Sequence, residues 1–537
     1  MKLKKLLALL AASCLLLGVL TACGGADGQE SGGASDENAV QEPEAVREPA
    51  NAEKTSDSAV VTTTAGQVRG TETDGVYQFL GIPYAEAKEL FVPAEAVTPW
   101  DGVRDADTYG VMSPQAGILG MGGGNAGEGT SNNCQNLNIW TPGTLDEGGR
   151  PVMVWLHGGG FSSGTANEPG VNGANMSRAG DVVVVGVNHR LNVFGFLNLS
   201  AYGEKYRDSA NTGVMDIVAA LQWVHDNIAA FGGDPDNVTI FGQSGGGAKV
   251  LAMMSTPYAS GLFHRGINQS GATETMGPVF FTEEQSELIG AKTMEKLGLD
   301  ADSVEEIQSM EPQTILDAAG AAIQEAAEEL RYPATIGEGY SMEWEPTVGG
   351  DFLPTNPVTE EGFAESGRDI PLLIGSNLNE WSMFMADALA YTDMSEEART
   401  SYAEAYPNED PETAPYVDTL LRLPLLKIMS HKAAQGGAQV YAYVFTKQDP
   451  QMGSYHGIEI PYVFHNTDDT ALADTMTAIW TNFARNGVPS ADGLEDWEPY
   501  ERANGATMIL DDTSYLAHRH DETLMNLLAP EYTWWPD

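Results

Sequence analysis

The fold of this chain is decided by the stretch Phe231-Gly-Gly-Asp-Pro-Asp-Asn-Val-Thr-Ile-Phe-Gly-Gln-Ser-Gly-Gly-Gly-Ala-Lys249. Its centre, Gly242-Gln-Ser-Gly-Gly246, matches the G-x-S-x-G pattern. In that pattern a serine stands at the tip of a sharp turn between a strand and a helix. Glycines keep the crowded backbone of such a turn free of side chains. The stretch therefore predicts that Ser244 is a nucleophile.

A second match to the pattern occurs at Gly160-Phe-Ser-Ser-Gly164, and a chain with 60 glycines produces such matches by chance. The flanking residues separate the two. Residues 238–241 are β-prone and residues 247–254 are helix-prone, so Ser244 has strand, turn and helix in the required order. Ser162 is followed by residues typical of a loop. The context favours Ser244.

The first 22 residues are typical of a targeting segment. Three lysines precede an apolar run, residues 6–20, that is too short to span a bilayer comfortably. The run ends in Leu20-Thr-Ala-Cys23, which resembles the lipobox of bacterial lipoproteins, whose cysteine becomes the lipid-bearing N-terminus. A plain secretory signal is the alternative. We expect an extracytoplasmic protein that is held to the bacterial cell membrane only by a lipid on Cys23.

Residues 23–57 are rich in Gly, Ala, Glu, Ser and Asp, and we expect a flexible acidic tether there. Removing the three signal lysines leaves 24 Lys and Arg against 76 Asp and Glu, a formal charge of −52. This charge argues against nucleic acid as a partner and against electrostatic docking on anionic lipid. Outside the signal segment and its lipobox the only cysteine is Cys134, which excludes an internal disulfide framework and a thiolate metal cluster.

Residues 58–537 carry the pattern of a large α/β domain. The near-continuous apolar runs 152–156 and 182–187 predict strands that are buried on both faces of a parallel sheet. Further strands are expected at 60–64, 67–70, 76–83, 238–241, 262–270, 369–375 and 440–445, and helices at 216–230, 247–254, 282–330 and 474–486. Alternation of strands and helices predicts a large, mostly parallel, twisted sheet flanked by helices.

A glycine run follows one of the apolar strands. His157-Gly-Gly-Gly-Phe161 is an HGGG-type loop, whose bare amides pair with the amide after a nucleophile to bind an oxyanion. A phosphate-binding loop is the alternative, but no Gly-Lys-Ser/Thr follows. We therefore expect the N–H groups of Gly159, Gly160 and Gly245 to form an oxyanion hole.

Taken together, these motifs resemble the type-B carboxylesterases, the cholinesterase-like branch of the α/β-hydrolases, and most of all the para-nitrobenzyl-esterase group. The resemblance covers about residues 58–537. Besides the serine stretch it rests on Leu137-Asn-Ile-Trp-Thr-Pro142, Asn188-His-Arg-Leu191, Asn268-Gln-Ser-Gly271, Asp351-Phe-Leu-Pro354 and Trp480-Thr-Asn-Phe-Ala-Arg485. It implies helical insertions around an active-site gorge and hydrolysis of small-molecule esters through an acyl-enzyme, with no metal or other cofactor.

The resemblance also implies a catalytic acid and base. The family's Gly-x-Asn-x-x-Glu segment is matched by Gly375-Ser-Asn-Leu-Asn-Glu380, which follows an apolar strand, and its His-Gly-x-Glu segment by His456-Gly-Ile-Glu459. Glu380 would orient His456, and His456 would activate Ser244. An exposed loop glutamate and His465 are the alternatives. Ser270 would support the acid, although a buried structural hydroxyl is an equal reading.

Two departures from the family pattern stand out. The signature cysteine appears as Asn132-Asn-Cys-Gln135 without its usual partner, so Cys134 is expected to be free, and an open glycine-rich segment, 117–130, replaces the disulfide-closed loop of relatives. The sequence leaves open an inactive adhesion module of the same fold and a hydrolase of amides or carbamates. It does not indicate the oligomeric state.

Overall fold

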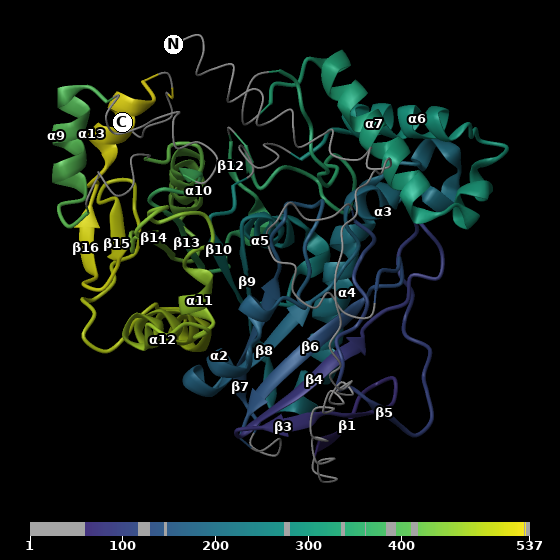
Figure 1. Ribbon diagram of the computed structural model, residues 1–537, viewed down its shortest axis with the longest axis horizontal. Coiled ribbons are helices and arrows are strands. Elements are labelled where there is room, and N and C mark those ends of the chain that lie inside the picture. The colour runs from purple at the N-terminus through teal and green to yellow at the C-terminus, as the bar shows by residue number, and fades with distance from the viewer. Residues whose placement is uncertain are drawn as a thin grey trace, which may run out of the picture. The chain divides into compact units, whose positions relative to one another are not determined.

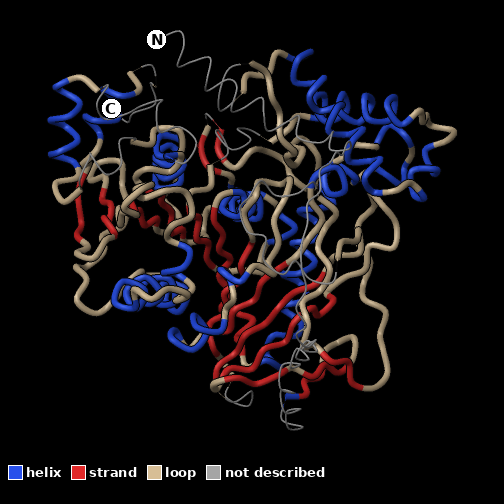
Figure 2. The backbone as a smooth tube through the Cα atoms, viewed as in Figure 1, coloured by secondary structure: helices blue, strands red, loops and turns tan. Residues whose placement is uncertain are grey.

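The computed structural model describes residues 59–115, 129–143, 148–272, 280–334, 339–359, 361–382, 394–409, 417–530 and 532. The expected signal segment and tether, and most of the glycine-rich segment 117–130, lie outside these residues. The described part is built on a mixed sheet of 11 strands in the order β16-β15-β14-β13-β10-β9-β7-β8-β6-β4-β3. Six strand pairings are parallel and four are antiparallel, as predicted for a mostly parallel sheet. Figure 2 shows these strands as one twisted band.

The strands of the large sheet are β3 (Thr71–Thr73), β4 (Val76–Pro83), β6 (Asn136–Pro142), β7 (Arg150–Leu156), β8 (Val183–Val187), β9 (Gly233–Gln243), β10 (Arg265–Gln269), β13 (Leu372–Asn377), β14 (Val440–Phe445), β15 (Ala506–Leu510) and β16 (Tyr515–His518). A small sheet holds β1 (Val60–Thr62), β2 (Gln67–Arg69) and β5 (Val103–Asp105), and a hairpin holds β11 (Val358–Thr359) and β12 (Gly362–Phe363). The α-helices are α2 (Ala174–Gly180), α3 (Asn192–Phe196), α4 (Thr212–Asn227), α5 (Gly245–Ser255), α6 (Glu283–Leu297), α7 (Pro312–Leu330), α9 (Glu396–Ala405), α10 (Arg422–Ala434), α11 (Ile460–Val463), α12 (Thr470–Asn486) and α13 (Glu522–Leu528).

Helices cover both faces of the sheet (Figure 1). Alternate side chains of a strand point to opposite faces, so Val152 and Val154 of β7 join a core with α4, α5 and α10, whereas Met153 and Trp155 join a core with α2 and α12. Both cores are apolar, which is why the central strands carry valine runs rather than alternation. On the first face α4 contributes Ile217, which is fully buried.

The expected strands and helices are confirmed with shifted boundaries, except that the predicted helical stretch 282–330 is divided into α6 and α7 by residues 298–311. Helix α4 begins at Thr212, four residues before the predicted start. This first turn was not predicted from the sequence because Thr-Gly-Val has low helix propensity. Gly213 is nevertheless needed there, since a Cβ on it would lie 2.6 Å from the carbonyl oxygen of Arg190. Four strands of the large sheet were not predicted from the sequence: β3, β6, β15 and β16.

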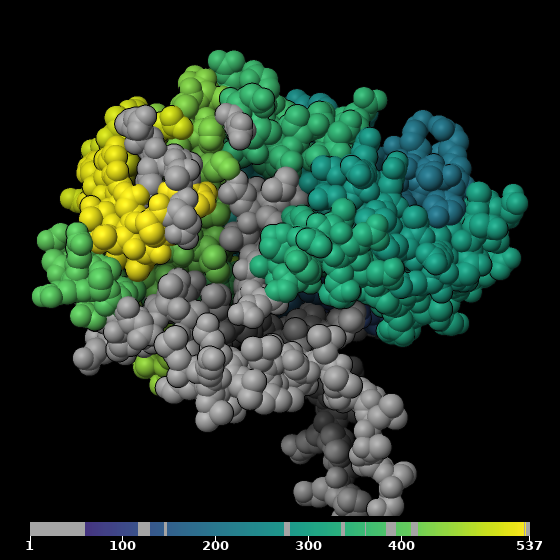
Figure 3. Space-filling model, turned by 90° about the horizontal axis from the view of Figure 1, so that it is seen from above, coloured from purple at the N-terminus to yellow at the C-terminus, as the bar shows by residue number. Residues whose placement is uncertain are grey.

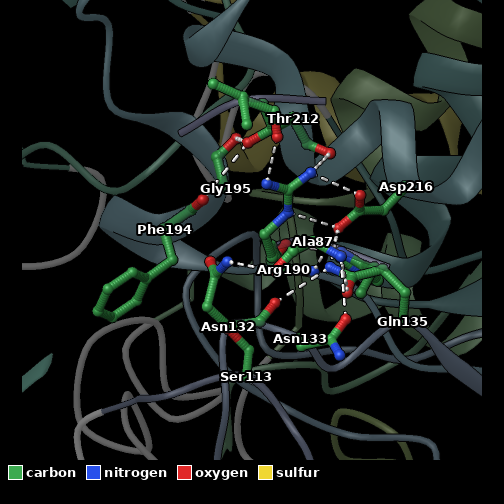
Figure 4. Close-up of polar contacts among 12 residues, drawn as sticks. Ala87, Ser113, Asn132, Asn133, Gln135, Arg190, Phe194, Gly195, Thr212 and Asp216 are labelled. Carbon is green, nitrogen blue, oxygen red and sulfur yellow. Dashed lines mark hydrogen bonds and ion pairs between the residues drawn. The ribbon is translucent and has the colours of Figure 1, made fainter. Parts of the chain in front are cut away.

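Cys134 is free and fully buried, as expected. The turn that contains it is tied by polar contacts instead of a disulfide. Gln135 donates to Asp216 at 3.0 Å, and Asp216 also accepts two hydrogen bonds from the Arg190 guanidinium, at 2.8 and 2.7 Å (Figure 4). Asn133 accepts from the amide of Ala87 at 2.9 Å. Burial raises the pKa of the Cys134 thiol, which keeps it protonated.

Helices α6 and α7 form the expected helical insertion. Thr282 caps α6 with its side chain on the amide of Gln285, and the Gln285 side chain returns to the Thr282 amide. In the view of Figure 3, the teal residues of α6 and α7 lie on the right and the yellow C-terminal residues lie on the left. The side chains of Leu316 and Ile323 of α7 line the main cavity, so this insertion walls the site described below. Within the described residues no helix is long and apolar enough to cross a membrane.

Candidate active site

Ser244 stands between β9 and α5 in the strained conformation that the sequence predicts. Its φ of 59° and ψ of −126° are unfavourable for a residue with a side chain. Gly242, Gly245 and Gly246 make the turn possible. A Cβ on Gly246 would lie 2.0 Å from the carbonyl oxygen of Leu156, and one on Gly245 would lie 2.4 Å from the nitrogen of Gly160. The backbones therefore meet more closely than side chains allow. Ser244 is held at the wall of the cavity.

The HGGG loop lies against this turn, after β7. Gly159 and Gly160 have φ of 87° and 60°, so both need the left-handed region that favours glycine. The close approach of Gly245 to Gly160 brings the start of α5 beside the loop. Neither Gly159 nor Gly160 donates its amide to another described residue. The three amides expected to form an oxyanion hole are thus neighbours, and those of the loop are available to a ligand.

Glu380 and His456 form a buried hydrogen-bonded pair at the carboxyl edge of the sheet. His456 Nδ1 lies 2.5 Å from Glu380 Oε2, and the His456 amide donates to the Glu380 carbonyl at 2.7 Å. Burial opposes the charged imidazolium, but the charge of Glu380 and its hydrogen bond outweigh it, so the pKa of His456 lies above the usual value for histidine. This arrangement suits a base that becomes positively charged during a reaction.

The acid is itself supported by a buried polar network. The Asn377 amide donates to Glu380 Oε1 at 2.7 Å, and the Asn377 side chain donates to Glu459 at 2.7 Å. Gln269 also donates to Glu459, at 3.1 Å. Ser270 does not take part: its backbone amide bonds to Gly375, and its buried hydroxyl has no partner among the described residues. Of the two readings of Ser270, the contacts therefore agree with the buried hydroxyl, and the acid is supported by Asn377.

Two residues that we did not assign from the sequence contact the imidazole directly. The ring of Trp381 stacks on His456, with centroids 4.4 Å apart and an angle of 24° between the planes. The side-chain nitrogen of Gln243 lies 3.2 Å from His456 Nε2, the atom that faces away from Glu380. Within the described part of the chain no hydrogen bond joins Ser244 to His456, and Gln243 occupies the free nitrogen.

Ser244, His456 and the HGGG loop line one cavity of about 820 Å³. Most of its walls are apolar, including Trp344 and Met342. Its charged side chains are carboxylates, Glu168, Asp317 and Glu343, and no lysine or arginine lines it within the described residues. Burial raises the pKa of Glu168 to about 6 and also raises that of Glu343.

The alternatives from the sequence have other surroundings. Ser162 follows the HGGG loop and also lines the cavity, but it lies in a loop and not in a turn between a strand and a helix. His465 pairs with Asp474 at 2.7 Å, and that carboxylate is largely exposed. Within the described residues no group of three or more His, Cys, Asp or Glu side chains could hold a metal ion.

This chain belongs to the carboxylesterase family, and it is a carboxylic-ester hydrolase with the α/β-hydrolase fold. The model of that family matches residues 57–416 and 413–526. Among characterised proteins, the chain is 33% identical to a para-nitrobenzyl esterase of Bacillus subtilis over 484 residues, covering 84% of this chain and 94% of that protein. It is 31% identical to a phenmedipham hydrolase of Pseudarthrobacter oxydans, with 84% and 94% covered.

A solved structure agrees with these sequence matches. An esterase from Clostridium hathewayi, described as able to hydrolyse aliphatic aromatic polyesters, superposes with a TM-score of 0.78 and 36% identity, over 88% of this chain and 98% of that one. At this identity the likeness extends beyond the fold to the family.

Proposed function

We propose that this esterase works through a Ser244–His456–Glu380 triad and an acyl-enzyme intermediate. His456 Nε2 takes the Ser244 proton as Oγ attacks the ester carbonyl carbon, whose π electrons move to oxygen. As the oxyanion collapses, the bond from the carbonyl carbon to the alcohol oxygen breaks, the imidazolium gives its proton to that oxygen, and the acyl group stays on Ser244 Oγ. Water then loses a proton to His456 as it attacks the acyl carbon, and collapse of the second oxyanion breaks the bond to Oγ, which takes the proton back as the acid leaves. The observation that carries this proposal is the buried 2.5 Å pair of Glu380 and His456 in the cavity that also holds the strained Ser244.

In this proposal Glu380 and the glycine amides act on the charges that develop. Glu380 holds the His456 tautomer whose Nε2 is free to accept a proton, and it stabilises the imidazolium. The amides of Gly159, Gly160 and Gly245 donate to the oxyanion. Trp381 limits rotation of the imidazole, while the Gln243 contact must give way when Ser244 transfers its proton.

The cavity supports uncharged esters as the substrate class. Three carboxylates and no basic side chain in the described lining disfavour an anionic acyl or alcohol group, whereas the apolar walls suit a neutral one. The test is a hydrolysis panel of nitrophenyl esters with graded acyl chains, run beside the matching nitroanilides. We expect hydrolysis of the esters by the wild type and none by Ser244→Ala. Full activity in the variant would refute the proposed nucleophile.

We further propose that the chain is a bacterial lipoprotein, with residues 1–22 removed, Cys23 acylated and residues 23–57 linking the lipid to the domain. The support is the sequence alone: the positive segment, the apolar run and the lipobox-like Leu20-Thr-Ala-Cys23. Cys23→Ser should release the protein from the membrane fraction or block its processing. Unchanged partitioning into membranes would contradict the anchor.

A further inference from the structure

Lys249 is a buried cation directly behind the HGGG loop. It lies in α5, five residues after Ser244, and is fully buried. Its ammonium donates to the carbonyl of His157 at 2.9 Å and to that of Gly160 at 2.8 Å. These are the first and last carbonyls of the four-residue loop, so a single side chain ties both of its ends to the helix that follows the nucleophile.

The two peptide planes that Lys249 holds bracket the two that carry the Gly159 and Gly160 amides. The intervening carbonyls are also occupied, since that of Gly158 accepts from His157 Nδ1 at 2.9 Å and that of Gly159 accepts from the Ser163 amide at 3.0 Å. All four carbonyls of the loop are therefore held by the protein. A run of glycines has little intrinsic rigidity, and external contacts must supply it.

To make these contacts, the fold buries an ionisable group in an environment that disfavours its charged form. Burial lowers the pKa of Lys249 to about 7, and the charge of Glu345 opposes that shift. Glu345 is buried as well, and neither of its carboxylate oxygens has a hydrogen-bond partner among the described residues. The Lys249 ammonium also lies 5.6 Å from the centre of the Phe161 ring. An apolar residue would avoid the cost of burying this charge.

A second lysine shows what a purely structural version of this contact looks like. Lys432 of α10 is buried and donates to the carbonyls of Gly367 and Arg368, at 2.8 and 3.1 Å, with the Phe363 ring 5.3 Å away. Burial lowers its pKa to about 8. None of these residues lines the cavity. The two lysines make the same kind of contact, and they differ in what the contact holds.

We propose that Lys249 is a positioning residue of the esterase, which holds the HGGG loop so that the Gly159 and Gly160 amides stay aimed at the oxyanion. This inference rests on the proposed function of that loop. Lys249 touches neither substrate nor reacting atoms. Its effect should therefore appear in the transition state, where the oxyanion forms, and be absent from binding of the uncharged ester.

The test compares Lys249→Met with the matched control Lys432→Met, each checked by its thermal melting curve. Inhibition is measured with a trifluoromethyl ketone, to which the nucleophile adds to give an oxyanion, and with the corresponding methyl ketone, which remains a neutral carbonyl. Lys249→Met should lower kcat about 10²-fold with KM within about threefold. The inhibition constant of the trifluoromethyl ketone should rise by the same factor, and that of the methyl ketone should stay unchanged.

Lys432→Met should lower the melting temperature but leave kcat, KM and both inhibition constants within about threefold of wild type. If Lys249→Met does not fold, Lys249→Gln, which keeps an N–H donor at a shorter reach, should show the same parallel shift at about tenfold. An equal rise in the inhibition constants of both ketones, or wild-type kcat in a folded Lys249 variant, would overturn the inference. A wild type insensitive to the trifluoromethyl ketone would instead refute the proposed nucleophilic mechanism.

Discussion

Replacing Glu380 with glutamine removes one charge from the buried pair while keeping the shape of the side chain. The contact of 2.5 Å between His456 Nδ1 and Glu380 Oε2 places the two charge centres about 4 Å apart. At an effective dielectric constant of about 20, their attraction is about 4 kcal/mol, or about 10³-fold in rate if it acts only on the imidazolium of the transition state. A glutamine amide that donates to Nδ1 would also favour the wrong tautomer, so we expect kcat to fall about 10³- to 10⁴-fold.

The same change should move the pH dependence in a defined direction. The base must be neutral, so kcat/KM rises as the pH passes upward through the pKa of His456 in the free enzyme. In the wild type Glu380 raises this pKa above 6.5 against the effect of burial. Without the Glu380 carboxylate, the lowering effect of burial on the pKa of His456 is opposed only by the charges of Glu459 and Asp418. The acid limb of kcat/KM should therefore move to lower pH.

The assay is kcat/KM for 4-nitrophenyl butyrate between about pH 5 and 9. Glu459→Gln is the matched control, because Glu459 is also buried, accepts from Asn377 and Gln269, and makes no direct hydrogen bond to His456. We expect Glu459→Gln to lower kcat/KM by less than about tenfold and to shift the acid limb less than Glu380→Gln does. A Glu380→Gln enzyme within tenfold of wild type, or one with an unmoved acid limb, would refute the reasoning.

Two more changes follow from contacts around the imidazole and in the cavity. Gln243→Glu would place a carboxylate where the amide now lies 3.2 Å from His456 Nε2, so the acid limb of kcat/KM should move to higher pH by about one unit; an unchanged limb would show that the side chain has left the imidazole. Glu343→Gln removes one of the carboxylates lining the cavity, so the preference for ethyl butyrate over the anionic monoethyl succinate, about tenfold or more in the wild type, should narrow when measured by acid release. An unaltered preference would place the charge selection elsewhere.

Local sterics explain what the sequence predicts well. The turn at Ser244 and the HGGG loop need glycines where two backbones approach closely. These glycines follow one another within a few residues, so a short sequence motif identifies both segments. The central strands are equally clear, because burial on both faces requires continuous apolar residues such as those of β7 and β8. The ends of α4 and the edge strands β15 and β16 are weaker signals, since their sequences carry neither a strong cap nor a long apolar run.

Contacts between residues far apart in the sequence cannot be predicted from a local pattern. Gln243 contacts His456, 213 positions further along the chain, and no motif near either residue indicates this contact. A lysine in a helix is usually exposed, so the burial of Lys249 could not be inferred from α5 alone. Ser270 shows the converse case: its place in a matched motif suggested a role in supporting the acid, but its buried hydroxyl has no hydrogen-bond partner among the described residues.

The most direct test of the account is covalent labelling of the wild-type protein with a fluorophosphonate, followed by mass spectrometry of its peptides. The account predicts one label, on Ser244. Ser244→Ala should lose the label together with about 10⁵- to 10⁶-fold in kcat, while Ser162→Ala keeps both. A label on Ser162, or ester turnover near the wild-type rate in Ser244→Ala, would contradict the assignment of the nucleophile on which the proposed mechanism depends.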